Sequence, residues 1–121
     1  MWLDPPQNLI LTEEEVHVWR ADLEVDEYIQ SSYLKLLSSD EKNRAGKFRF
    51  AKDRRNFIAA RGILRLLLAK YLEIHPTEIS FQYSKFGKPG LANNNSFQFN
   101  ISHSQNIAVF AFTIKFSIGI D

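Results

Sequence analysis

The feature that most constrains the fold of this chain is a helical pattern over residues 53–72. Apolar residues recur in it at spacings of three, four and seven positions: Phe57, Ala60, Leu64, Leu67, Leu68 and Tyr71. This recurrence puts them on one face of an α-helix, and such a face has to pack against another apolar surface. The Asp53 carboxylate suits the amino-terminal end of that helix. We therefore expect a long helix that covers a sheet.

Three arginines of the same helix, Arg54, Arg61 and Arg65, fall on one line along the edge of the apolar stripe. Their spacings of seven and four residues nearly complete whole helical turns. An arginine at such a boundary either lays its alkyl stem over the apolar surface or offers a rigid fork to a phosphate. The sequence leaves both interpretations open.

Three segments before this helix have patterns of their own. Residues 16–23 mix β-branched, aromatic and polar side chains, which predicts a strand. A short helix is expected over residues 26–37. A second helix should run to about residue 48, because Ser38 and Glu41 have the spacing of a capping box.

After His75-Pro76 the pattern changes from helical to alternating, which is typical of strands. The expected strands are residues 79–83, 97–101, 107–112 and 116–120, with turns at residues 86–90 and 113–115, the second turn joining the last two strands as a hairpin. The predicted fold class is therefore α+β, with the arginine-lined helix packed on an antiparallel sheet.

Length and composition favour one globular domain over residues 1–121. With 45% hydrophobic and 24% charged residues, the chain has neither a disordered nor a membranous composition. It has no cysteine, so a disulfide framework and a thiolate metal site are excluded and a cytoplasmic location is expected. No leader and no spanning segment is expected, because Asp4, Pro5 and Pro6 interrupt the first apolar residues.

The charges are distributed unevenly along the chain. Residues 1–41 hold ten acids and two bases, whereas residues 42–70 hold ten bases and one acid, a net charge of +9 at neutral pH. Such a block can attract the phosphates of a nucleic acid, a nucleotide or a phosphorylated cofactor. The alternative is an ordinary solvated helix face.

A Ser-His pair, Ser102-His103, stands before one predicted strand, and Gly119-Ile120-Asp121 follows that strand. Neighbouring backbone segments with these residues could hold a phosphate-sized anion and a metal. A hard divalent cation usually takes several oxygen ligands, so Asp121 alone is only part of a metal site.

Seven motifs, taken in order, carry a resemblance to a known family. They are Lys42-Asn43-Arg44-Ala45-Gly46-Lys47-Phe48, Asp53-Arg54-Arg55, Ala60-Arg61, Leu64-Arg65, Phe86-Gly87-Lys88-Pro89, Phe99-Asn100-Ile101-Ser102-His103-Ser104 and Gly119-Ile120-Asp121. Their order resembles that of the Sfp-type 4′-phosphopantetheinyl transferases, over nearly the whole chain from about Val16.

The resemblance implies an enzyme that moves the 4′-phosphopantetheine arm of coenzyme A to a serine of an acyl or peptidyl carrier protein, with Mg²⁺ as cofactor. The family fold has two similar halves related by a pseudo-twofold axis, and this chain resembles the first half. The family's further carboxylates and its Trp-x-x-Lys-Glu segment find no match in this sequence. The chain alone is therefore expected to be inactive, and a lone half is expected to expose an apolar patch through which it could self-associate.

The resemblance also implies roles for individual residues. Asp121 and His103 are the expected catalytic residues, and Asp121 is the expected Mg²⁺ ligand. Coenzyme A is expected to contact six side chains. Its adenosine 3′-phosphate would meet Arg44, Lys47 and Arg61. Its nucleotide would meet Lys88, and its phosphates would meet Ser102 and His103.

Two other functions remain open at this stage. One is a coenzyme A or nucleotide-binding module without catalysis. The other is a nucleic-acid binder that uses residues 42–70, although these residues show no interleaving of aromatic and basic side chains and no recognition-helix motif. We expect neither a nucleic acid nor a membrane as partner.

Overall fold

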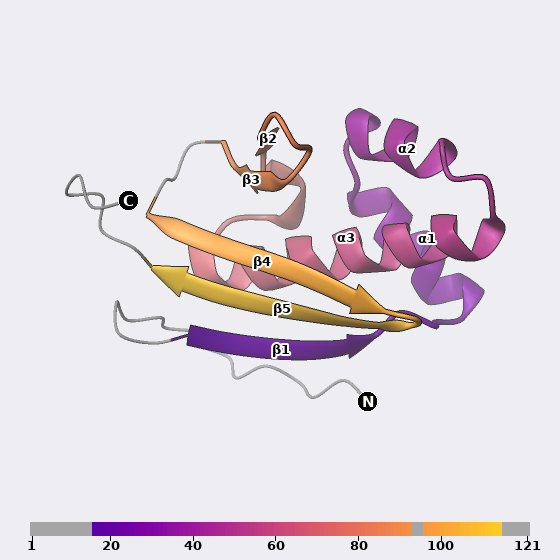
Figure 1. The fold of residues 1–121 in the computed structure, drawn as a ribbon, viewed down its shortest axis with the longest axis horizontal. Helices are drawn as coiled ribbons and strands as arrows, with labels where there is room; N and C mark the ends of the chain where they lie inside the picture. Colours follow the sequence, from indigo (N-terminus) through magenta and orange to yellow (C-terminus); the bar gives the residue numbers. More distant parts are fainter. Residues whose placement is uncertain (1–15, 93–95, 115–121) are drawn as a thin grey trace.

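The computed structural model describes residues 16–92 and 96–114, and they form an α+β fold (Figure 1). The elements in chain order are β1 (Val16–Asp22), α1 (Glu27–Leu36), α2 (Ser39–Gly46), α3 (Ala51–Leu72), the short 3-10 helix η1 (Pro76–Glu78), β2 (Phe81–Tyr83), β3 (Pro89–Leu91), β4 (Phe97–Ser104) and β5 (Ile107–Ile114). The predicted fold class, a long helix on an antiparallel sheet, is confirmed.

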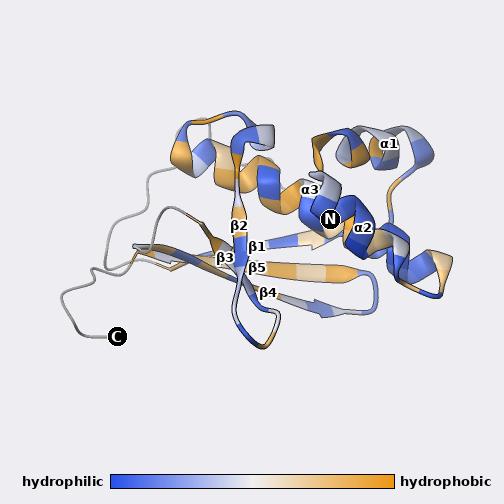
Figure 2. Ribbon diagram, turned by 90° about the horizontal axis from the view of Figure 1, so that it is seen from above, coloured by the Kyte–Doolittle hydropathy of each residue, from blue (hydrophilic) through white to orange (hydrophobic). Residues whose placement is uncertain are grey.

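The main sheet has three antiparallel strands in the order β1-β5-β4, so β5 is the central strand. A separate two-stranded sheet pairs β2 with β3. All the helices lie on one face of the main sheet (Figure 2). Among the described residues no element covers the other face, where Val16 and Val18 are 60% and 62% exposed.

The core lies between α3 and the sheet. Leu64, Leu68, Phe110 and Phe112 have no exposed surface, and Leu67 is 1% exposed. Most of the predicted apolar stripe is thus buried as expected. Successive side chains of β5 point to opposite faces of the sheet, so Phe110 and Phe112 lie on the same face, the one that meets α3.

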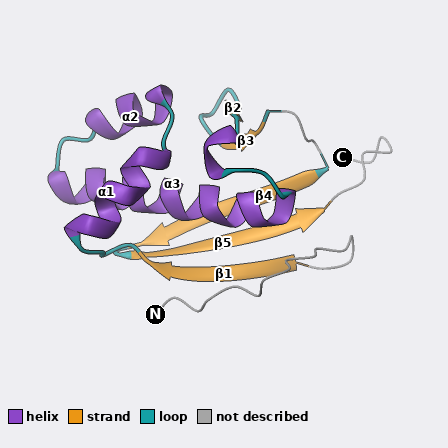
Figure 3. Ribbon diagram, turned by 180° about the vertical axis from the view of Figure 1, so that it is seen from behind, coloured by secondary structure: helices purple, strands orange, loops and turns teal. Residues whose placement is uncertain are grey.

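Two smaller helices pack beside α3. Figures 1 and 3 place α1 and α2 beside its amino-terminal half and the β2–β3 sheet nearer its other end. The predicted capping box is present: the Glu41 backbone N–H donates to Ser38 Oγ at 3.2 Å, and the Ser38 N–H donates to Glu41 Oε1 at 2.9 Å. Helix α3 begins two residues before the predicted Asp53, and its N-cap, Phe50, makes no side-chain capping bond.

The predicted turn at residues 113–115 is wrong for the two residues that the structure describes. Thr113 pairs with Val16 and Ile114 pairs with Phe97, so β5 continues through both. Both residues are β-branched and favour a strand over a turn. The hairpin instead joins β4 to β5 through Gln105, whose φ is 56°. The predicted strand 116–120 lies outside the described residues.

The predicted turn at residues 86–90 is shorter than expected. Pro89 and Gly90 belong to β3, and the turn is closed by the Gly87 N–H, which donates to the Ser84 carbonyl at 2.9 Å. Gly87 has a φ of +83°, which glycine adopts without strain. Lys88 is therefore held at the start of β3.

Alanine in place of Gly62 is expected to destabilise the protein. A Cβ at position 62 would lie 2.5–2.7 Å from Cγ, Cβ and Cδ1 of Tyr33, the half-buried α1 residue whose phenol pKa is raised by burial. Those atoms lie near the Tyr33 backbone and cannot move without moving α1. Overpacking of this kind typically costs about 1–3 kcal/mol, more than the ~1 kcal/mol that alanine gains over glycine in a helix. Thermal unfolding followed by circular dichroism measures the loss.

Gly46→Ala in α2 is the matched control. A Cβ there meets nothing within 4 Å, so the unfolding free energy should stay unchanged or rise by up to about 1 kcal/mol. Equal stability of the two variants would show that Tyr33 and Gly62 are not in close contact.

Within the described ranges, no helix has both the length and the apolar character that crossing a bilayer requires.

Candidate functional site

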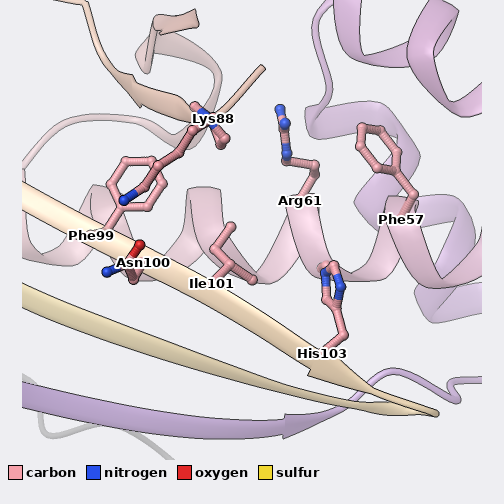
Figure 4. Close-up of a pocket in the computed structure, with 9 residues that line it drawn as sticks. Phe57, Arg61, Lys88, Phe99, Asn100, Ile101 and His103 are labelled. Atoms are coloured by element: carbon pink, nitrogen blue, oxygen red, sulfur yellow. The ribbon is translucent and has the colours of Figure 1, made fainter. Parts of the chain in front are cut away.

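A pocket of about 310 Å³ opens between α3, the β2–β3 hairpin and β4 (Figure 4). Its lining residues are Phe57, Ala60, Arg61, Lys88, Pro89, Phe99, Asn100, Ile101 and His103. Three of the six residues that were expected to contact coenzyme A meet here, although they are 15 to 42 positions apart in the sequence.

Each of these three residues comes from a different element. Arg61 lies on α3, Lys88 directly precedes β3, and His103 lies on β4 (Figure 4). Alternation along β4 puts His103 on the same face as Phe99 and Ile101, which is the face toward α3. The fold therefore brings three residues that are distant in sequence to the same pocket.

The charge of this pocket is one-sided. Arg61 and Lys88 are cationic, and none of the lining residues in the described part of the chain is acidic. Guanidinium and ammonium groups together with apolar walls favour a ligand that has both anionic and apolar parts.

Arg61 and Arg65 are buried and share one carboxylate. Arg61 Nη1 donates to Glu41 Oε2 at 3.1 Å, and Arg65 Nε donates to Glu41 Oε1 at 2.8 Å. The three residues are 6%, 2% and 1% exposed. The sequence offered two roles for these arginines, an alkyl stem laid over the apolar surface or a fork for a phosphate. Neither role describes this arrangement fully, because both guanidinium groups are paired inside the protein. Arg54 differs, since its Nη2 donates to the Phe48 carbonyl at 3.2 Å.

Arg44 lies next to this ion network. Its Cζ stands 3.7 Å from the centre of the Tyr83 ring, and the Tyr83 hydroxyl accepts a bond from Arg61 Nη1 at 2.8 Å. A hydrogen bond from Arg44 Nε to Asp40 at 2.9 Å raises the pKa of the guanidinium, which keeps its charge. Arg44, Tyr83 and Glu41 line a second, more polar cavity of about 450 Å³.

Two further predicted residues, Lys47 and Ser102, do not line the first pocket. Lys47 is the exposed C-cap of α2. Ser102 is exposed on β4, and strand alternation puts it on the opposite face from His103. Their predicted contacts with coenzyme A stay predictions. Asp121, the expected catalytic and Mg²⁺-binding carboxylate, lies outside the described residues.

No metal site is formed by the described residues, because no three histidine, aspartate or glutamate side chains gather there. They do not fit Mg²⁺ as a bound group. The Mg²⁺ expectation rests on Asp121 alone.

Sequence reasoning did not assign site roles to Tyr83 and Glu41. Tyr83 was an aromatic residue at the end of a predicted strand, and nothing in the local pattern showed that it would lie between two arginines. Glu41 was recognised only as a capping residue. One signal was present: it is the acid directly before the basic block, in the first turn of the helix that precedes the arginine-lined one.

The basic block is only partly open to solvent. Arg61 and Arg65 are buried and Arg44 is engaged with Asp40 and Tyr83, whereas six other bases are exposed: Lys42, Lys47, Arg49, Lys52, Arg55 and Lys70. Phosphate-backbone binding relies on exposed cations, so the nucleic-acid interpretation loses three of the ten bases on which it rested.

The sequence of this chain and its fold both match proteins of known class. Residues 24–115 match the family described as 4′-phosphopantetheinyl transferase, N-terminal, and the chain belongs to this family. The predicted family, including the amino-terminal half, is thereby confirmed.

Individual relatives agree with this assignment. The chain is 44% identical to the 4′-phosphopantetheinyl transferase HetI of Nostoc sp. over 99% of its own length and 52% of that protein. It is 39% identical to the human L-aminoadipate-semialdehyde dehydrogenase-phosphopantetheinyl transferase over 70% of its length and 29% of that protein. The chain thus spans about half the length of HetI and less than a third of the human relative.

A solved structure shares the fold. It is a holo-(acyl-carrier-protein) synthase from Bacillus anthracis in complex with CoA (3′,5′-ADP), with a TM-score of 0.65 and 21% identity over 84% of this chain and 96% of that one. At this identity the likeness establishes the architecture.

Proposed function

We propose that this chain supplies the coenzyme A-binding half of a 4′-phosphopantetheinyl transferase that modifies a serine of an acyl or peptidyl carrier protein. The observation that carries the proposal is the pocket that gathers Arg61, Lys88 and His103 from three elements. Family membership and the coenzyme A named with the Bacillus anthracis structure support it.

The reaction moves the phosphopantetheine arm as a phosphoryl transfer. The serine oxygen of the carrier protein forms a bond to the β-phosphorus of coenzyme A. The bond from that phosphorus to the adenosine side breaks, and its electron pair leaves with 3′,5′-adenosine bisphosphate, while the serine proton passes to solvent. Most of the catalysis therefore consists of positioning the two reactants and neutralising the charge on the phosphates.

The pocket residues can perform both tasks. The Arg61 guanidinium suits the dianionic 3′-phosphate, because charge-assisted bonds to a fork-shaped donor are strong and directional. Arg44 and Lys47 are the further candidates for that phosphate. Lys88 contacts the nucleotide, and His103 donates a hydrogen bond to the phosphates. The Ser102 contact stays a prediction, because Ser102 does not line this pocket. Asp121 is the proposed Mg²⁺ ligand, and a bound ion would supply further positive charge for the phosphates.

Coenzyme A is expected to bind more tightly than dephospho-coenzyme A. The two differ only in the 3′-phosphate, whose charge-assisted bonds are worth about 1.5–3 kcal/mol, or roughly a 10- to 150-fold difference in Kd. Isothermal titration calorimetry with both ligands measures the ratio. Arg61→Ala and His103→Ala are each expected to remove most of the preference.

Arg20→Ala is the matched control for Arg61→Ala. Arg20 is exposed on β1, on the opposite face of the sheet from α3, so this variant should keep the wild-type ratio. Equal affinities of the wild-type chain for the two ligands would refute the proposed 3′-phosphate site.

Mass spectrometry of an apo carrier protein tests the alternative, a coenzyme A-binding module without catalysis. The carrier is incubated with coenzyme A, Mg²⁺, this chain and a second-half polypeptide of the same family, and a module without catalysis would leave its serine unmodified. Five further expectations stay predictions: that the 121-residue chain alone does not modify the carrier, that residues 1–121 form one domain, that the chain can self-associate, that it resides in the cytoplasm, and that Asp121 binds Mg²⁺.

A further inference from the structure

The acid that joins α2 to α3 has a role beyond the capping box. We infer that Glu41 is a positioning residue, which fixes the Arg61 guanidinium at the coenzyme A pocket before any ligand arrives. The inference rests on the proposed function, since it concerns how that pocket recognises a phosphate.

One carboxylate holds three partners. Glu41 Oε1 accepts from the Ser38 backbone N–H at 2.9 Å and from Arg65 Nη2 at 2.6 Å, while Oε2 accepts from Arg61 Nη1 at 3.1 Å. The carboxylate is 1% exposed, so water does not compete for these bonds. Both oxygens are engaged, and the first turn of α2 is tied to the middle of α3.

The Arg61 side chain is held from several sides. Its Nη1 also donates to the Tyr83 hydroxyl at 2.8 Å, and its Cζ lies 5.0 Å from the centre of the Phe57 ring and 5.3 Å from that of Phe81. Within the described part of the chain, both hydrogen bonds start from Nη1. The N–H groups on Nη2 and Nε therefore remain for a ligand in the pocket that Arg61 lines.

Among the described residues the charges of this cluster do not balance. Arg61 and Arg65 carry two positive charges and Glu41 carries one negative charge, which leaves one positive charge in a buried network. An anion in the pocket would neutralise it. Glu41→Gln would raise this excess to two, so a weaker phosphate preference in that variant comes from the lost positioning of Arg61 and not from lost positive charge. A guanidinium that is already fixed also loses little freedom on binding, and this strengthens phosphate recognition.

Glu41→Gln tests the inference, because glutamine keeps the shape of the side chain and removes its charge. We expect the ratio of dissociation constants for dephospho-coenzyme A and coenzyme A to fall about tenfold or more from the wild-type value, toward one. Ser38→Ala is the matched control. It removes the other half of the capping box and weakens α2 by a typical cap loss, but it leaves the bonds from Glu41 to both arginines.

The possible outcomes distinguish a failure of the positioning role from a failure of the proposed function. A folded Glu41→Gln variant that keeps the full ratio overturns the positioning role and leaves the proposed function intact. A fall in Ser38→Ala as large as that in Glu41→Gln also overturns it, because a merely structural effect would then explain both. A wild-type chain without preference refutes the proposed function instead.

If the Glu41→Gln variant does not fold, the positioning role can be tested on the ligand-free wild-type protein. Nitrogen-15 NMR of the Arg61 guanidinium, assigned by its loss in Arg61→Lys, is expected to show separate Nη1 and Nη2 signals from slow rotation. A single averaged signal would mean that Glu41 does not fix the group, and would overturn the inference.

Discussion

Arg65→Ala is expected to lower the free energy of unfolding by about 3–5 kcal/mol, as the loss of one partner from a buried ion pair typically does. Arg65 is 2% exposed, and its Nη1 also donates to the carbonyls of Pro76 and Ile79 at 2.8 and 2.9 Å. Alanine would leave both carbonyls without this donor, and among the described residues Glu41 would keep Arg61 as its one cationic partner. Urea unfolding followed by circular dichroism measures the change.

Arg54→Ala, on the same helix, controls for the loss of an arginine as such. Among the described residues, the Arg54 side chain makes one hydrogen bond, to the Phe48 carbonyl, near the amino-terminal end of α3. Its substitution should change the unfolding free energy by only about 0.5 kcal/mol. Similar losses for the two variants would contradict the buried network around Glu41.

Phe110→Ala is expected to destabilise the protein by a comparable amount, about 3–5 kcal/mol. Phe110 has no exposed surface and lies on the central strand, facing α3. The substitution removes apolar contacts and leaves a cavity that the sheet, bonded on both sides of β5, cannot readily close. The midpoint of chemical denaturation reports the effect.

The same substitution at Phe86 provides the comparison. Phe86 is 87% exposed in the β2–β3 hairpin, so Phe86→Ala should leave the unfolding free energy within about 0.5 kcal/mol of wild type. A small loss at Phe110 would show that β5 does not form the centre of the core.

The helices could be predicted because their signals are local. The Ser38 capping box and the apolar stripe of α3 each depend on residues within a few turns, and both are present in the structure. The pairing of β1 with β5 could not be predicted in this way. Its partners, such as Trp19 and Phe110, are too far apart in sequence for any periodicity to relate them.

The site was predictable to a similar degree. Residue types and the family resemblance selected Arg61, Lys88 and His103, and the fold brings them to one pocket. The pairing of Arg61 and Arg65 with Glu41 escaped prediction, because it depends on how α2 docks against α3. The spacing of the arginines placed them on one side of the helix, but it did not show that Glu41 would pair with them in the interior.

The position of β5 between β4 and β1 determines the order in which the strands of the main sheet pair during folding. The β4–β5 hairpin closes through Gln105 and Asn106, whereas the pairing of Asp22 with Ile107 closes a loop that contains all the helices. Loop-closure entropy makes the second event slower than the first. A nascent chain therefore carries β1 unpaired, and the apolar face of α3 without its sheet, until the ribosome has released the residues of β5.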